Sequence, residues 1–152
     1  MLDIYVDADG CPVKNEVYRV AERYSLGVTL VANAWMRVPN RDRVELVLVD
    51  AGLDAADDWI AEHVTENDIV VSADIPLADR CIKKGARVLS PRGRVFTEDS
   101  IGGALATRDL LSHLRESGTI SGGPAPFAKQ DRSQFLQRLD EIVQSIRRQK
   151  FS

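Results

Sequence analysis

The stretch Ile69-Val70-Val71-Ser72-Ala73-Asp74-Ile75-Pro76 decides the fold, because it passes from a strand into a helix within a few residues. Its first three residues are all apolar, which is typical of a short strand in the middle of a parallel sheet. Pro76 then lies in the first turn of the following helix, where a missing N–H costs nothing. A buried parallel strand that leads directly into a helix predicts an α/β fold.

Strands and helices alternate on both sides of this stretch as far as residue 90, so the architecture extends outward from it. We predict a three-layer α/β fold, in which a mostly parallel five-stranded sheet carries helices on both faces. The five strands are expected at residues 2–6, 28–32, 44–49, 69–71 and 87–89.

Two helices are expected in the C-terminal third, one over residues 99–116 and one that Asp131 caps. A loop rich in glycine and proline, at 117–130, joins them. A chain of 152 residues is typical of one domain. We therefore predict a single domain over 1–152, with a sheet core at 1–98 and the helices of 99–152 packed on it as an appendage.

The composition narrows the class of protein. With 44% hydrophobic and 28% charged residues, the chain resembles ordinary globular proteins and excludes collagen-like, disordered and coiled-coil classes. No apolar run is long enough for a bilayer, and the first residues lack a signal-peptide pattern, so we expect a cytoplasmic protein with no membrane partner. Cys11 and Cys81 form neither a disulfide framework nor a zinc motif. No pattern indicates an oligomeric state.

Charge is distributed unevenly along the chain, although the net charge is only −3. Residues 50–79 contain nine acidic residues and no lysine or arginine, whereas residues 80–94 contain six basic residues and no acid. Two solvated helix faces explain such blocks, and on charge alone we favour that interpretation.

Several aspartates follow the expected strands, at the edge where parallel sheets bind ligands. If the first and fourth strands are neighbours, Asp7, Asp74 and Asp79 converge there, and Asp58 or Asp57 reaches them from the side. Each also has a structural explanation, since Asp74 is a favourable N-cap and acidic residues suit the first turn of a helix. Asp9 precedes Gly10 and fits a simple turn.

Close carboxylates repel one another, and either retained protons or a divalent cation makes such a cluster tolerable. Mg²⁺ prefers oxygen ligands and keeps several waters, so it needs only a few carboxylates. Such an ion activates water and stabilises a leaving oxygen at a phosphodiester. The basic run that begins at Arg80 would then lie near a polyanionic substrate.

Three motifs resemble those of the YaiI/YqxD family of uncharacterised bacterial proteins, over nearly the whole chain. They are Asp7-Ala8-Asp9-Gly10-Cys11-Pro12-Val13-Lys14, Val71-Ser72-Ala73-Asp74-Ile75-Pro76-Leu77-Ala78, and Gly122-Gly123-Pro124-Ala125-Pro126-Phe127 followed by Asp131-Arg132. This family has no established activity, so the resemblance by itself implies no reaction.

A wider resemblance is to the PIN-like nucleases, including their NYN branch. It implies a PIN-like domain that cleaves RNA with Mg²⁺ or Mn²⁺. The implied catalytic and metal-binding residues are Asp7, Asp58, Asp74 and Asp79, with Asp9, Asp57 and Ser72 as secondary members. Asp79 lies one position further along than in the NYN pattern, and the Gly-Pro-Phe segment has no counterpart in those enzymes. We expect Arg80, Lys83, Lys84 and Lys14 to contact the RNA.

Two other functions remain open beside a metal-dependent ribonuclease. The Asp7-x-Asp9 pattern after a first strand is similar to the start of haloacid-dehalogenase-like phosphatases, in which Asp7 would be the nucleophile and Asp9 a general acid. That chemistry needs a lysine, and Lys14, the only lysine between Asp9 and Asp79, follows Asp9 too closely. The third hypothesis is a non-catalytic module that binds RNA or a protein.

Overall fold

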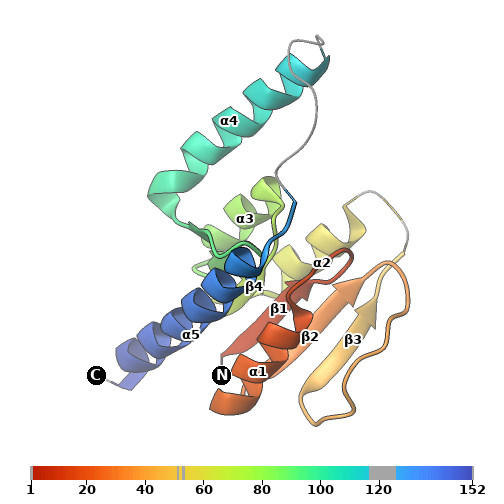
Figure 1. Cartoon of the computed structure of the whole chain (residues 1–152), viewed down its shortest axis with the longest axis vertical. Coiled ribbons are helices and arrows are strands. Elements are labelled where there is room, and N and C mark those ends of the chain that lie inside the picture. The colour runs from red at the N-terminus through yellow and green to blue at the C-terminus, as the bar shows by residue number, and fades with distance from the viewer. Residues whose placement is uncertain (1, 51, 53, 117–125, 152) are drawn as a thin grey trace.

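The computed structural model describes residues 2–50, 52, 54–116 and 126–151. Within them the chain forms a six-stranded mixed sheet with helices on both faces (Figure 1). The elements are β1 (Asp3–Asp7), α1 (Lys14–Tyr24), β2 (Gly27–Ala32), β3 (Val44–Leu48), α2 (Ala55–His63), β4 (Ile69–Val71), α3 (Ile75–Ile82), β5 (Arg87–Leu89), β6 (Val95–Phe96), α4 (Glu98–Glu116) and α5 (Lys129–Phe151).

The sheet has the order β3-β2-β1-β4-β5-β6, and all neighbours are parallel except β5 and β6. The predicted α/β class is confirmed, and β1 and β4 are neighbours. The expected count of five strands was one too low among the described residues. A tight turn reverses the chain after β5, with the Ser90 N–H donating to the Arg94 carbonyl at 2.8 Å. The returning strand, β6, has only two residues, too few to show a strand pattern.

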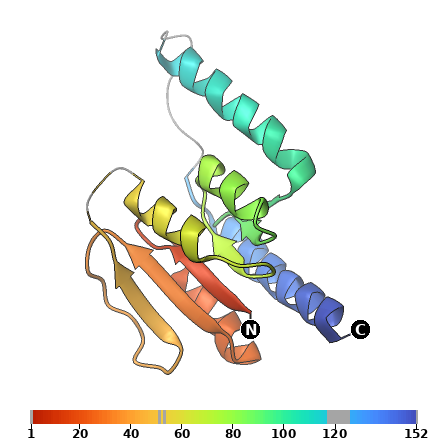
Figure 2. The ribbon, with the colours of Figure 1, turned by 180° about the vertical axis from the view of Figure 1, so that it is seen from behind.

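Each face of the sheet carries its own apolar core. Ile4 and Val6 of β1 point toward α1 and α5, whereas Val70 of β4 and Val88 of β5 point toward α2, α3 and the start of α4. Figure 2 shows the second of these layers from behind. All four side chains are fully buried. The strands β1, β4 and β5 therefore lie between two layers of helices, as their apolar sequences require.

Helix α5 is an integral part of the first core, which corrects the expectation of an appendage. Phe135, Leu139 and Val143 are completely buried against it. The helix starts two residues earlier than expected, and Asp131 caps it from inside the first turn, where its carboxylate accepts from the Ala128 N–H at 2.9 Å. The expected loop at 117–130 lies largely outside the described residues.

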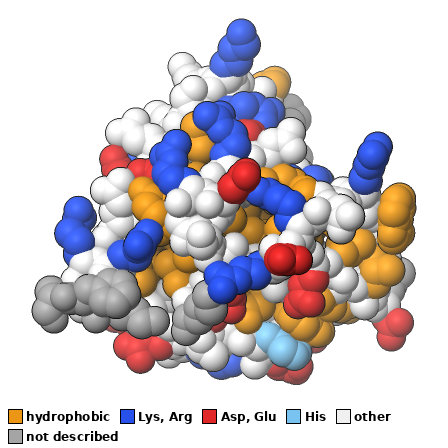
Figure 3. All heavy atoms as spheres, turned by 90° about the horizontal axis from the view of Figure 1, so that it is seen from below, with side chains coloured by type: hydrophobic (Ala, Val, Ile, Leu, Met, Phe, Trp, Pro, Cys, Tyr) orange, Lys and Arg blue, Asp and Glu red, His pale blue; other side chains and the backbone are white. Residues whose placement is uncertain are grey.

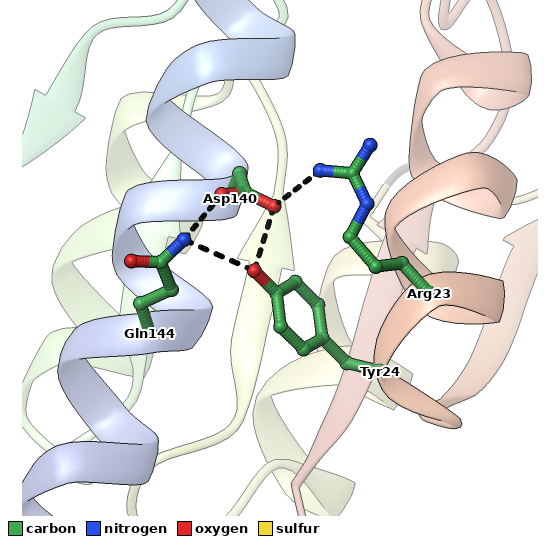
Figure 4. A network of polar contacts seen from close by, with 4 residues as sticks. All are labelled: Arg23, Tyr24, Asp140 and Gln144. Carbon is green, nitrogen blue, oxygen red and sulfur yellow. Dashed lines mark hydrogen bonds and ion pairs between the residues drawn. The ribbon is translucent and has the colours of Figure 1, made fainter.

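Polar contacts fix the middle of α5 to the C-terminal end of α1 (Figure 4). Asp140 accepts hydrogen bonds from Arg23 Nη1 and the Tyr24 hydroxyl, both at 2.9 Å, and from Gln144 Nε2 at 2.7 Å. Gln144 also donates to the Tyr24 hydroxyl at 3.1 Å.

Helix α4 packs on α3 through Ile101 and Ala104 and then extends away from the sheet (Figure 1).

At the start of α2, Asp54 occupies the N-cap position, but its side chain makes no capping hydrogen bond. In the described part of the chain, no helix combines the length and apolar character needed to cross a bilayer.

Replacing Gly93 by alanine tests the contact between the β5–β6 turn and α5. Gly93 has φ +89°, and a Cβ there would lie 2.9 Å from the carbonyl carbon of Gln134. Gly10 has a similar φ of +73°, but its Cβ would meet nothing within 4 Å. In both variants an alanine must adopt a positive φ, which lowers the free energy of unfolding by about 1–2 kcal/mol. We expect Gly93→Ala to lose about 1–3 kcal/mol more in urea unfolding, because α5 must shift. Equal losses would contradict this contact.

Candidate functional site

The candidate site lies at the carboxyl ends of β1 and β4, where the direction of strand order reverses. Helix α1 follows β1 and covers one face of the sheet, whereas α3 follows β4 and covers the other. The chain connections therefore diverge at this point and leave a crevice between them, which is where open α/β sheets bind ligands. The register places Val6 opposite Val71, so Asp7 and Ser72 come next to each other.

Ser72 connects the two aspartates that follow these strands. Its hydroxyl donates to Asp7 Oδ2 at 3.0 Å and accepts from the backbone N–H of Asp74 at 3.0 Å. Ser72 is only 2% exposed, so these bonds are shielded from water. Asp74 Oδ1 accepts from the Leu77 N–H at 2.9 Å, which confirms the predicted N-cap of α3. The residues that precede and begin α3 thus hold the carboxylates of Asp7 and Asp74 together.

Asp57, in the first turn of α2, completes this cluster. Its side chain is hydrogen-bonded to Asp74, and burial together with the negative charges of Asp74 and Asp7 raises its pKa to about 7. Burial also raises the pKa of Asp7, with a further rise from the charges of Asp74 and Asp9 and an opposing effect of the Ser72 hydrogen bond. A hydrogen bond between two carboxyl groups requires a proton, and the raised pKa assigns that proton to Asp57. We call Asp7, Asp57 and Asp74 the carboxylate cluster.

The structure places Asp58 and Asp79 in ion pairs of their own. Asp58 Oδ1 lies 2.8 Å from Arg80 Nη1, and its side chain is 56% exposed. Asp79 Oδ2 lies 2.8 Å from Lys83 Nζ, one turn along α3. Of the two adjacent aspartates of α2, Asp57 therefore faces Asp7 and Asp74. The residues alone left Asp57 and Asp58 open, and the resemblance to PIN-like nucleases implied Asp58.

Asp9 lies beside the cluster and has a partner of its own. Its Oδ2 accepts from the Asn33 N–H at 2.7 Å, so it ties the loop after β1 to the loop after β2. Its charge still acts on Asp7, where it contributes to the raised pKa. Asp9 thus adds negative potential to the site from an exposed position.

Two of the four basic residues expected to contact RNA lie away from the carboxylate cluster. Helix α3 runs from the carboxyl end of β4 toward the edge where the strands begin, so Lys83 and Lys84 lie at that edge. Lys84 Nζ donates to the carbonyls of Ala61 and Glu62 at the end of α2. Figure 3 views this edge, where blue and red side chains are interspersed. Lys14 begins α1, after the loop that follows Asp7, and its Nζ donates to the Cys11 carbonyl at 3.2 Å.

The donor chemistry of the cluster fits a hard divalent cation that keeps most of its waters. Its three members offer only carboxylate oxygens, and within the described ranges no lysine or arginine forms an ion pair with them. Across those same ranges, no group of three or more His, Cys, Asp or Glu side chains has the arrangement of a metal site. Mg²⁺ is commonly held by one or two carboxylates together with water and substrate phosphates, which this arrangement permits.

Comparison with known proteins identifies the family of the chain. Residues 5–145 match the model of the family described as "Uncharacterized BCR, YaiI/YqxD family". A UPF0178 protein of Rhodospirillum centenum is 58% identical over 152 residues, which cover 97% of this chain and 99% of that protein. A UPF0178 protein of Rhodospirillum rubrum is 55% identical over 148 residues, with 97% and 99% covered. No solved structure matches. The chain belongs to the uncharacterised YaiI/YqxD family.

Proposed function

We propose that this protein hydrolyses phosphodiester bonds of RNA and that Mg²⁺ or Mn²⁺ is held at the carboxylate cluster. One observation supports the proposal above others. Asp7, Asp57 and Asp74 come from three separate segments, meet at the switch point of the sheet, and have no cationic partner among the described side chains. Half-buried carboxylates whose negative charges act on one another, without such a partner, favour the binding of a cation.

The three side chains have different roles in this proposal. Ser72 holds Asp7 through Oδ2, so the orientation of that carboxylate is fixed before a ligand arrives. The capping bond from the Leu77 N–H holds Asp74 Oδ1, so the start of α3 fixes the orientation of this carboxylate. Asp57, whose pKa is raised to about 7 when no cation is bound, contributes a third carboxylate to the proposed site. The bound ion would supply activation of a water and neutralisation of charge at the phosphodiester.

The adjacent residues Asp57 and Asp58 offer alternative assignments of the third carboxylate. The resemblance to PIN-like nucleases implies Asp58, whereas the contacts support Asp57, because Asp58 pairs with Arg80. We propose Asp57 as the member that contacts the ligand and Asp79 as a residue of the α3 surface, paired with Lys83.

Replacing Asp74 tests the proposal directly. Asparagine retains an oxygen for the Leu77 cap, so the fold should persist, but the carboxylate is lost. We expect Asp74→Asn to lower Mg²⁺-dependent cleavage of a labelled RNA by at least about 100-fold. The matched control is Asp50→Asn, an exposed aspartate after β3, which should retain wild-type cleavage.

Unchanged cleavage in the Asp74→Asn variant would remove the proposed function. Release of phosphate from a monoester, with a phosphorylated Asp7 trapped by mass spectrometry, would instead support phosphatase chemistry. RNA binding without turnover under any divalent ion would support a non-catalytic module.

The raised pKa of Asp57 predicts how stability depends on pH without metal. The folded chain binds this proton with a pKa of about 7, against an ordinary value of 3.8, so stability is present at acid pH and is lost as the pH rises toward about 7. Because Asp57 is half-exposed, we discount the effect to about 1 kcal/mol, which corresponds to about 2–4 °C in Tm.

We therefore expect Asp57→Asn to reduce the fall in Tm between about pH 5 and about pH 8 in EDTA. Asp58→Asn is the control, because it removes a carboxylate from the adjacent residue. Its Tm should fall with pH as much as that of the wild type. Mg²⁺ should raise the Tm of the wild type at about pH 8 by more than that of Asp57→Asn, because a cation relieves the same repulsion. An identical fall in wild type and Asp57→Asn would show that the carboxylates do not interact as described.

A further inference from the structure

Two arginines and one phenylalanine form a second group at the carboxyl edge of the sheet, outside the carboxylate cluster. The guanidinium carbons of Arg92 and Arg132 lie 5.9 Å and 5.2 Å from the centre of the Phe127 ring. Arg92 belongs to the turn after β5, whereas Phe127 and Arg132 flank the start of α5. Phe127 and Arg132 come from the third sequence motif of the family, to which the proposed function gives no role. We call Arg92 and Arg132 the arginine pair.

Protein contacts hold both guanidinium groups in place. Arg132 Nη1 donates to Glu16 Oε1 at 2.6 Å and to the Pro12 carbonyl at 2.7 Å. Arg92 Nη1 lies 3.3 Å from Asp131 Oδ2. The side chains nevertheless remain 46% and 38% exposed, respectively. An arginine whose plane is fixed on an aromatic ring loses little entropy when its fork binds an oxyanion.

The arginine pair lies next to the segment that leads away from Asp7. Pro12 and Glu16, the partners of Arg132, flank Lys14, whose Nζ donates to the Cys11 carbonyl. Pro12 follows Asp7 by five residues, so one short loop separates the partner of Arg132 from the carboxylate cluster.

Helix α3 brings one basic side chain within electrostatic reach of the cluster, since the charge of Asp57 acts on the Arg80 guanidinium, which also pairs with Asp58. Lys83 lies toward the opposite edge of the sheet. Further basic side chains at the carboxyl edge come from the start of α1, the turn after β5 and the start of α5.

We propose that Arg92 and Arg132, together with Lys14, bind phosphate groups of an RNA strand beside the carboxylate cluster. Phe127 holds the two guanidinium planes, and Glu16 and Asp131 fix their orientation. This inference rests on the proposed function and adds the residues that bind its substrate. It also gives an aromatic ring and an arginine of the third motif, Phe127 and Arg132, a direct role at the site.

Salt-dependent binding of a fluorescein-labelled single-stranded RNA of about 12 nucleotides tests this proposal. The affinity is measured by anisotropy in EDTA, which prevents turnover, between about 25 and about 200 mM salt. Loss of one phosphate contact reduces the slope of log K against log salt by about 0.7 for a single strand. We expect Arg92→Gln to show this reduction and about fivefold weaker binding. Arg92→Lys should restore the slope, because it restores the charge.

Arg23→Gln is the matched control, since it removes the same charge from another α1–α5 ion pair, at the far end of α1 (Figure 4). It should retain both the affinity and the slope of the wild type. Arg132→Gln alone leaves Glu16, which is 5% exposed, without its partner. The double variant Glu16→Gln/Arg132→Gln avoids an unpaired buried charge and should also lose about 0.7 in slope.

An unchanged slope in both the Arg92→Gln and the double variant overturns the proposal, as does an equal loss in Arg23→Gln or a wild type that does not bind the RNA. Cleavage by the wild type in Mg²⁺ is measured separately. Cleavage with unchanged slopes would leave the proposed function intact and remove only the arginine pair. Reduced slopes without cleavage would support the arginine pair and remove hydrolysis.

Discussion

The pairing of β1 with β4 is the constraint on which the candidate site depends. Ile4 and Val6 on one strand and Ile69 and Val71 on the other are fully buried, so neither strand can shift without exposing apolar surface. A shift by one residue would turn every side chain to the opposite face of the sheet. Hydrophobic burial thus fixes the register, and the register brings Asp7 beside Ser72 at the point where the strands end. The core provides the free energy that keeps the carboxylates together.

This arrangement has an electrostatic cost. The raised pKa of Asp7 and Asp57 shows that the folded state disfavours the charged forms of both side chains. Stability alone would favour an asparagine or an apolar residue at such positions, because partly desolvated negative charges that lie close together destabilise a fold. Functional sites are where proteins retain such conflicts between local chemistry and stability. A cation at the proposed site would offset this cost.

The sequence predicted those features that depend on local patterns. The apolar run at 69–71, the proline in the first turn of α3 and the cap by Asp74 are all confirmed. It could not select between Asp57 and Asp58, because consecutive residues of a helix point about 100° apart and the rotation of α2 is set by its packing. The contribution of α5 to the core was missed for a similar reason. The pattern showed an apolar helical face, but the surface that it covers is more than a hundred residues away in sequence.

The packing of α5 on α1 brings residues of the C-terminal part of the chain close to the segment that follows Asp7. The helix lies along α1 and is fixed near both ends of that contact, by Asp140 with Arg23 and Tyr24 at one end and by Arg132 with Glu16 at the other. The first contact is exposed and lies far from the carboxylates, so it serves the docking of α5.

The second contact, between Arg132 and Glu16, lies beside the loop that follows Asp7 and includes a buried carboxylate, Glu16. The Arg132 side chain is half-exposed, so this ion pair orients a guanidinium at the surface and does not fill the core. The closing helix thus contributes a charged side chain beside the segment that follows Asp7, as well as apolar side chains to the core.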